Sequence, residues 1–81
     1  MARFVLDDHA QRRRARGSLY ITWEMIDRVL AQPGEIRPAR TIAGRPAAII
    51  YIRALDGNRL RVYVEAGSDP MYVVTVAWEE R

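Results

Sequence analysis

The only histidine of the chain, His9, is spaced with three arginines so that all four fall on one face of a helix. Arg12, Arg13 and Arg16 follow His9 at i+3, i+4 and i+7, which at 100° per residue spans an arc of about 100°. Arginines bind phosphate oxygens and histidine moves protons, so this face suits a phosphodiester. The plainer interpretation is a basic helix face that is exposed to solvent.

A second set of candidate residues lies on the predicted sheet. Tyr51 and Arg53 on one strand and Arg61 and Tyr63 on the next are expected to project to the same face, with Thr75 of a third strand beside them. Aromatic rings next to arginines on a sheet stack bases and bind phosphate, which predicts nucleic-acid binding there. The alternative is that the tyrosines form cross-strand pairs and that the threonine reflects β propensity.

The elements that position these residues follow from the periodicity of the sequence. Helices are expected over residues 7–16 and 22–31, with Asp7 or Asp8 as the N-cap of the first and Thr22 as the N-cap of the second. From Pro46 onward the apolar residues recur with a period of two, which predicts strands over residues 46–54, 59–66 and 71–78. The expected fold is a single α+β domain with two N-terminal helices packed on a three- to four-stranded antiparallel β-meander.

Three further segments are less regular. Arg3–Leu6 is short and apolar and suits either an edge strand or the lead-in to a helix. Residues 32–45 hold two prolines and two glycines and are predicted to form a long loop, with at most one irregular strand. Residues 55–58 read Leu-Asp-Gly-Asn, which predicts the turn of a hairpin between the first two strands.

Composition favours an anionic partner. The 81 residues fit one small domain, and the net charge is +3. All 13 basic residues are arginine, which reflects either a GC-rich genome or the suitability of guanidinium groups for phosphate. Residues 1–20 carry five arginines against two aspartates, residues 21–45 sum to +1 and residues 46–81 to −1. The basic excess therefore lies at the start of the chain.

Several classes of site are excluded or weakly supported. The chain has no cysteine, and one histidine with scattered carboxylates lacks metal-ligand spacing, so neither a metal nor a cofactor is expected. Asp7 and Asp8 suit helix capping better than magnesium binding. Ser18 and Ser68 lie in turns without a histidine motif nearby. The longest apolar run, residues 47–52, is too short for a membrane span, and the start of the chain has no signal pattern, so a cytoplasmic protein is expected.

A family resemblance covers roughly residues 3–78 of the chain. The motifs that carry it are Asp8-His9-Ala10, the arginine run that ends in Arg16-Gly17, Ile21 to Leu30 with Pro33, Leu60 to Val64, Asp69-Pro70, and Val73 to Val76. Together they resemble the domain-of-unknown-function 4258 family of small bacterial domains. That family is similar to the RelE, ParE and BrnT toxins, in which two helices precede an antiparallel sheet.

The resemblance implies a metal-independent ribonuclease or a toxin-like member of a toxin–antitoxin pair, with RNA and an antitoxin protein as partners. The implied roles are His9 as base or acid, Arg12, Arg13, Arg16 and Arg61 as phosphate clamps, and Thr75 or Tyr63 as positioning groups. In such a cleavage the 2′-hydroxyl attacks the adjacent phosphate. This interpretation requires His9 to face Arg61 and Thr75 across a cleft.

Two other interpretations stand beside the nuclease. One is a non-catalytic domain that binds nucleic acid or a protein, in which the basic face acts only through its charge and His9→Ala leaves function intact. The other is a homodimer through an exposed edge of the last strand, Met71 to Trp78, with Tyr72 and Trp78 as apolar anchors.

Overall fold

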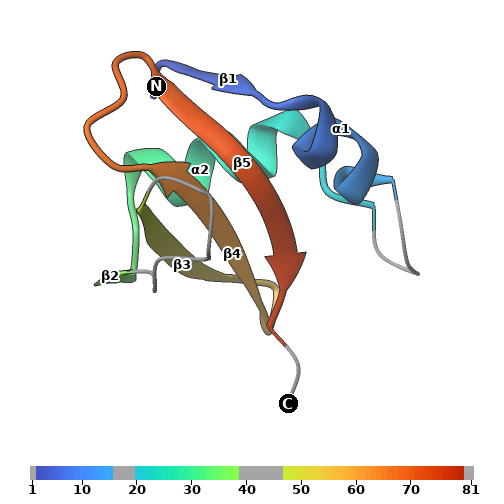
Figure 1. The fold of residues 1–81 in the computed structure, drawn as a ribbon. Coiled ribbons are helices and arrows are strands. Elements are labelled where there is room, and N and C mark those ends of the chain that lie inside the picture. Colours follow the sequence, from blue (N-terminus) through green and yellow to red (C-terminus); the bar gives the residue numbers. More distant parts are fainter. Residues whose placement is uncertain (1, 16–19, 39–46, 80–81) are drawn as a thin grey trace.

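The computed structural model describes residues 2–15, 20–38 and 47–79, and these residues form two short helices and one mixed sheet (Figure 1). In chain order the elements are β1 (Phe4–Leu6), α1 (Asp8–Arg14), α2 (Trp23–Ala31), β2 (Glu35–Pro38), β3 (Ala48–Leu55), β4 (Asn58–Glu65) and β5 (Met71–Trp78). Over this part of the chain the five strands lie in the order β1-β5-β4-β3-β2. Figure 1 shows α2 behind the sheet and α1 beside β5.

The predicted fold of two helices on an antiparallel meander is wrong. β1 runs parallel to β5, with Phe4 opposite Met71, and this pairing makes the sheet mixed. A parallel pair needs a long crossover, which here contains both helices and the other three strands. β2 lies inside the segment that was expected to be a long loop with at most one irregular strand, and it pairs antiparallel with β3. Both additions depend on contacts between distant segments, which local periodicity does not report.

The hydrophobic core lies between the sheet and the helices. Alternate residues of β4 point toward it, and Leu60 and Val62 are fully buried. The other core residues include Val64, Val73 and Val76 from the sheet, Ile26, Val29 and Leu30 from α2, and Ala10 from α1. Burial of this apolar surface is the main stabilising contribution to the fold. α1 contributes a single small side chain, so most of its surface is left for other contacts.

Side-chain caps set where both helices begin. The carboxylate of Asp7 accepts a hydrogen bond from the backbone N–H of His9 at 3.0 Å, and the Tyr72 hydroxyl donates to the same carboxylate. The hydroxyl of Thr22 accepts from the backbone N–H of Met25 at 3.2 Å. These oxygens satisfy N–H groups that have no partner within the helix. Asp7 therefore also fixes the start of α1 to β5.

The edge of the last strand that a homodimer was expected to use is covered only in part, because β1 pairs with its first three residues and does not extend along residues 74–78. Met71–Val73 are already paired with β1, so β1 and β2 form the edges of the sheet in the described part of the chain. The Tyr72 hydroxyl is bonded to Asp7, and Trp78 packs against the core. The proposed anchors thus have intramolecular contacts. Among the described residues, neither helix is long and apolar enough to cross a membrane.

Candidate nucleic-acid interface

α1 carries three of the four residues of the predicted basic face, His9, Arg12 and Arg13. Arg12 is exposed, and His9 and Arg13 are half-buried. Neither Arg12 nor Arg13 forms an ion pair with a carboxylate of the described residues. Their guanidinium groups are therefore available to an external anion. Arg16, the fourth residue of the predicted face, lies outside the described residues.

Arg14, which sits among these arginines, has a different role. Its Nε donates to the carbonyl of Ile21 at 3.0 Å, and its two other nitrogens donate to Gln11 Oε1 at 2.9 Å and to the Tyr20 hydroxyl at 3.0 Å. The guanidinium carbon also lies 5.3 Å from the centroid of the Tyr20 ring. These contacts hold α1 against the segment that leads into α2. Arg14 was not among the predicted site residues, because spacing along the sequence does not reveal its partners.

Tyr51 and Arg53 do not share a face with Arg61 and Tyr63, contrary to expectation. The turn between β3 and β4 has two residues, Asp56 and Gly57, both with positive φ, and it places Leu55 opposite Asn58. A two-residue turn of this kind fixes the register of the whole hairpin. The register places Tyr51 opposite Val62 and Arg53 opposite Leu60, which is the face that carries the core.

Both of these residues have structural contacts on that face. Tyr51 packs against the core cluster, and Arg53 donates from Nη1 to the carbonyl of Gln32 at 2.8 Å. Gln32 is the C-cap of α2, where backbone carbonyls lack helical partners and a cation is favourable. These contacts explain both residues without a bound nucleic acid.

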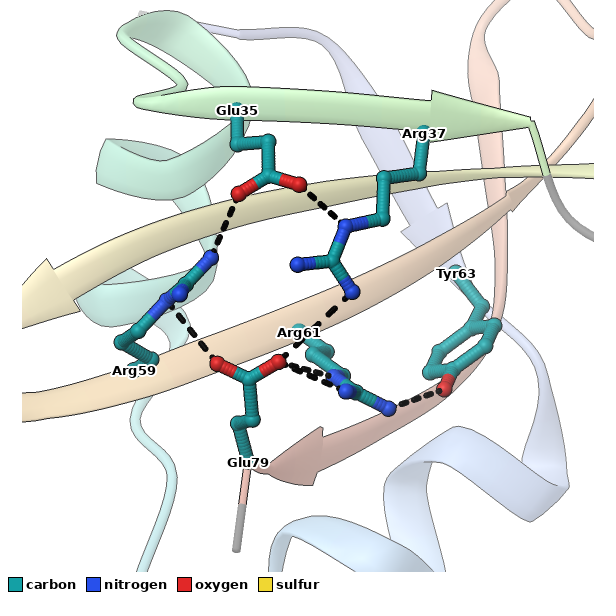
Figure 2. A network of polar contacts seen from close by, with 6 residues as sticks. All are labelled: Glu35, Arg37, Arg59, Arg61, Tyr63 and Glu79. Atoms are coloured by element: carbon teal, nitrogen blue, oxygen red, sulfur yellow. Dashed lines mark hydrogen bonds and ion pairs between the residues drawn. The ribbon is translucent and has the colours of Figure 1, made fainter. Parts of the chain in front are cut away.

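The face of the sheet that points away from the helices carries a network of ion pairs (Figure 2). Glu79, which follows β5, accepts hydrogen bonds from Arg61 Nη2 at 2.6 Å and pairs with Arg59 Nε at 2.9 Å. Arg37 Nη1 lies 3.7 Å from the same carboxylate. The carboxylate of Glu35 accepts a hydrogen bond from Arg37 Nε, and its Oε1 lies 2.7 Å from Arg59 Nη2. We call these five residues the arginine–glutamate network.

The network neutralises its own charges. Hydrogen bonding from Arg61 is the main reason that the pKa of Glu79 is lowered, and Arg37 followed by Arg59 lowers the pKa of Glu35. The reciprocal effect raises the pKa of Arg61, through Glu79 first and then Tyr63. Three arginines against two glutamates leave the network with a net charge of only +1. The arginines of the sheet are thus less available to phosphate than those of α1.

The lowered carboxylate pKa values predict a loss of stability in acid. A carboxylate whose pKa is lower in the folded state stabilises the fold above its unfolded value, about 4.5, and this contribution is lost as the pH falls through the folded pKa. Glu79→Gln should therefore reduce the loss of stability between about pH 5 and pH 3, measured by urea unfolding. Glu24→Gln, at an exposed residue with no ion pair among the described ones, should leave the profile unchanged. Identical acid profiles for wild type and Glu79→Gln would contradict this assignment.

Three of the residues proposed for catalysis lie on different elements: His9 on α1, Arg61 on β4 and Thr75 on β5. Thr75 lies opposite Tyr63 in the β4–β5 pairing, and Arg61 donates to Glu79 and, at 3.4 Å, to the Tyr63 hydroxyl. Within the part of the chain that the structure describes, the one hydrogen bond from His9 to a side chain is donated by its backbone N–H to the carboxylate of Asp7. No hydrogen bond of the described residues links the His9 imidazole to Arg61 or Thr75. The structure therefore separates a basic helix from a paired network on the sheet.

A surface pocket near the start of α2 is lined by aromatic rings and carboxylates, in contrast to the basic face of α1. Phe4 and Trp23 stack there with ring centroids 4.5 Å apart, and Glu24 and Asp27 add two carboxylates. Asp27 accepts a hydrogen bond from the backbone N–H of Ala2 at 2.7 Å. The two carboxylates make this pocket unfavourable for phosphate. In residues 2–15, 20–38 and 47–79, no group of three or more acidic or histidine side chains is arranged to hold a metal ion.

Four residues of the network, Glu35, Arg37, Arg59 and Glu79, were not among the sequence candidates. The alternation of β4 places Arg59 on the polar face, but its partners depend on the positions of β2 and of the end of β5. Comparisons of the chain with protein-family models, curated proteins and solved structures found no match. The resemblance to the domain-of-unknown-function 4258 family thus rests on its motifs and stays a prediction.

Proposed function

We propose that this domain binds the phosphodiester backbone of nucleic acid through α1, and that it does so without cleaving the strand. The observation that supports this most strongly is the contrast between its arginines. Arg12 and Arg13 have no carboxylate partner among the described residues, whereas Arg59 and Arg61 of the sheet are paired with glutamates. A polyanion gains most from the guanidinium groups that are not already neutralised.

The surroundings of α1 fit this proposal. The helix is attached at both ends, by Asp7 to Tyr72 and by Arg14 to Ile21, so its basic face is presented on a fixed support. Asp7 is engaged by these internal bonds and offers little competition for the arginines. Two or three phosphate contacts give a salt dependence with a slope of about −1.4 to −2.1 on single strands. The expected binding is modest in affinity and tolerant of sequence.

Cleavage is not part of the proposal, because it requires more groups than α1 provides. General acid–base catalysis needs groups within hydrogen-bond reach of the reacting atoms or one water away. Among the described residues, no hydrogen bond joins the His9 imidazole to a second proton-transfer group or to an arginine of the sheet. RNA incubated with the wild type in chelator should stay intact.

The test is charge reversal on α1. Arg12→Glu with Arg13→Glu should weaken binding of a labelled single-stranded RNA by at least about tenfold and flatten the salt slope by roughly 1.4, since each phosphate contact on a single strand contributes about 0.7. Fluorescence anisotropy over a range of salt concentrations measures both quantities. The matched control is Arg3→Glu with Arg28→Glu, because both arginines are exposed and lack carboxylate partners among the described residues. This double variant changes the net charge of the protein as much as the first one does.

The control pair also separates the proposal from a general effect of charge. Equal losses in both double variants would contradict a binding site on α1. A single-stranded DNA of the same sequence tests whether the sugar matters. Cleavage of the RNA that disappears in His9→Ala would replace the proposal with the nuclease interpretation.

A further inference from the structure

We propose that Arg37, Arg59 and Arg61 form a binding site for a phosphomonoester, and that the side chain of Glu79 occupies this site in the free protein. The inference is independent of the binding proposed for α1, because it concerns the opposite face of the sheet. Figure 2 shows the three guanidinium groups, from β2 and β4, around the carboxylate of Glu79.

The geometry is that of an anion site that already holds an anion. Glu79 Oε1 lies 2.6 Å from Arg61 Nη2 and 3.7 Å from Arg37 Nη1, and Oε2 lies 2.9 Å from Arg59 Nε. Three cations thus share one carboxylate, which has two oxygens. A phosphomonoester offers three oxygens that accept hydrogen bonds, one for each guanidinium group.

Charge favours the exchange. The arginine–glutamate network carries three positive and two negative charges, and moving the Glu79 carboxylate into solvent leaves three against one. A dianion in its place then brings the site to zero, whereas Glu79 leaves it at +1. Glu35 remains bonded to Arg37 and Arg59 and keeps two of the arginines oriented.

Access to the site is also open. The side chains of Arg37 and Arg59 are 40% and 41% exposed, while that of Glu79 is 16% exposed beneath them. Glu79 follows the last residue of β5, and its backbone N–H donates to the carbonyl of Arg59 at 2.8 Å. Its side chain can therefore rotate away while this backbone bond holds the strand in place. Loss of the Glu79 contacts opposes binding, so the wild type should bind phosphate weakly.

The test removes the internal competitor. The Nε–Hε signals of the arginines in ¹⁵N-labelled full-length protein are followed by NMR while inorganic phosphate is added at constant ionic strength. Glu79→Gln should bind phosphate at least about tenfold more tightly than the wild type, since a charged competitor has become neutral. Glu65→Gln is the matched control, because Glu65 lies on the same face of β4 as Arg61 and forms no ion pair among the described residues. Equal affinity of Glu79→Gln and wild type would overturn the proposal.

A measurement on the wild type keeps the proposal testable if Glu79→Gln fails to fold. Phosphate should shift the Nε–Hε signals of Arg59 and Arg61 along a saturating curve, while the signal of Arg28 on α2 should drift without saturation. Uniform drift of all arginine signals would overturn the proposal. A nucleoside 5′-monophosphate and its nucleoside distinguish a nucleotide end from free phosphate as the source of the group. The nucleoside alone should produce no saturating shift.

Discussion

Replacing Leu60 with alanine should lower the free energy of unfolding by about 2–5 kcal/mol. Leu60 is fully buried in β4, a central strand of the sheet, and its side chain belongs to the core between the sheet and the helices. The substitution removes apolar contacts and leaves a cavity that the surrounding side chains fill only in part. Since a domain of this size is stabilised by only about 4–12 kcal/mol, this loss is a large fraction of the total stability.

Urea unfolding at neutral pH measures this loss. Leu60→Met keeps the volume nearly unchanged and should cost less than about 1.5 kcal/mol. A Leu60→Ala variant as stable as the wild type would mean that Leu60 does not face the core, and that the register of β3, β4 and β5 is wrong.

Ile52→Ala should destabilise the protein by a similar amount, about 2–5 kcal/mol, although Ile52 lies on the other face of the sheet. Ile52 is 1% exposed and stands outside the main core cluster. Its partners in neighbouring strands are Glu35 and Arg61, two members of the arginine–glutamate network. Long arginine side chains often cover apolar surface with their aliphatic parts, which accounts for a buried isoleucine under a charged network.

The control for this prediction is another isoleucine of the sheet. Ile36 on β2 is 56% exposed, so Ile36→Ala should change the free energy of unfolding by no more than about 0.5 kcal/mol. Equal effects of the two substitutions would contradict the assignment of Ile52 to a buried position. Ile52→Ala should also broaden the Nε–Hε signal of Arg61, because the arginine side chains of the network lose the apolar surface against which they pack.

Local features of the fold could be predicted from the sequence because their causes are local. Asp7 and Thr22 cap helices with their own side chains, and both helices begin directly after them. The turn at Asp56 and Gly57 closes the hairpin between β3 and β4 as expected. The alternation of Leu60 with its neighbours also identified the buried side of β4.

The long-range features could not be predicted in this way. Whether Phe4–Leu6 becomes a strand is decided by Met71–Val73, more than sixty residues away. The face on which Arg53 lies depends on the register between β3 and β4. A change of register by one residue would move every side chain of the strand to the opposite face. The candidate site residues likewise comprise some that local spacing predicts and some that only the assembled sheet brings together. The basic face of α1 is set by helical spacing alone, whereas the position of Glu79 beside Arg59 and Arg61 requires the assembled sheet.

The most direct test of the account is to map where a single-stranded RNA contacts the protein, using the backbone amide signals of ¹⁵N-labelled protein during a titration. We expect saturating shifts for the amides of α1, including His9, Arg12 and Arg13, and much smaller shifts on α2. Shifts confined to the sheet, or none at RNA concentrations that saturate the anisotropy signal, would contradict a nucleic-acid interface on α1.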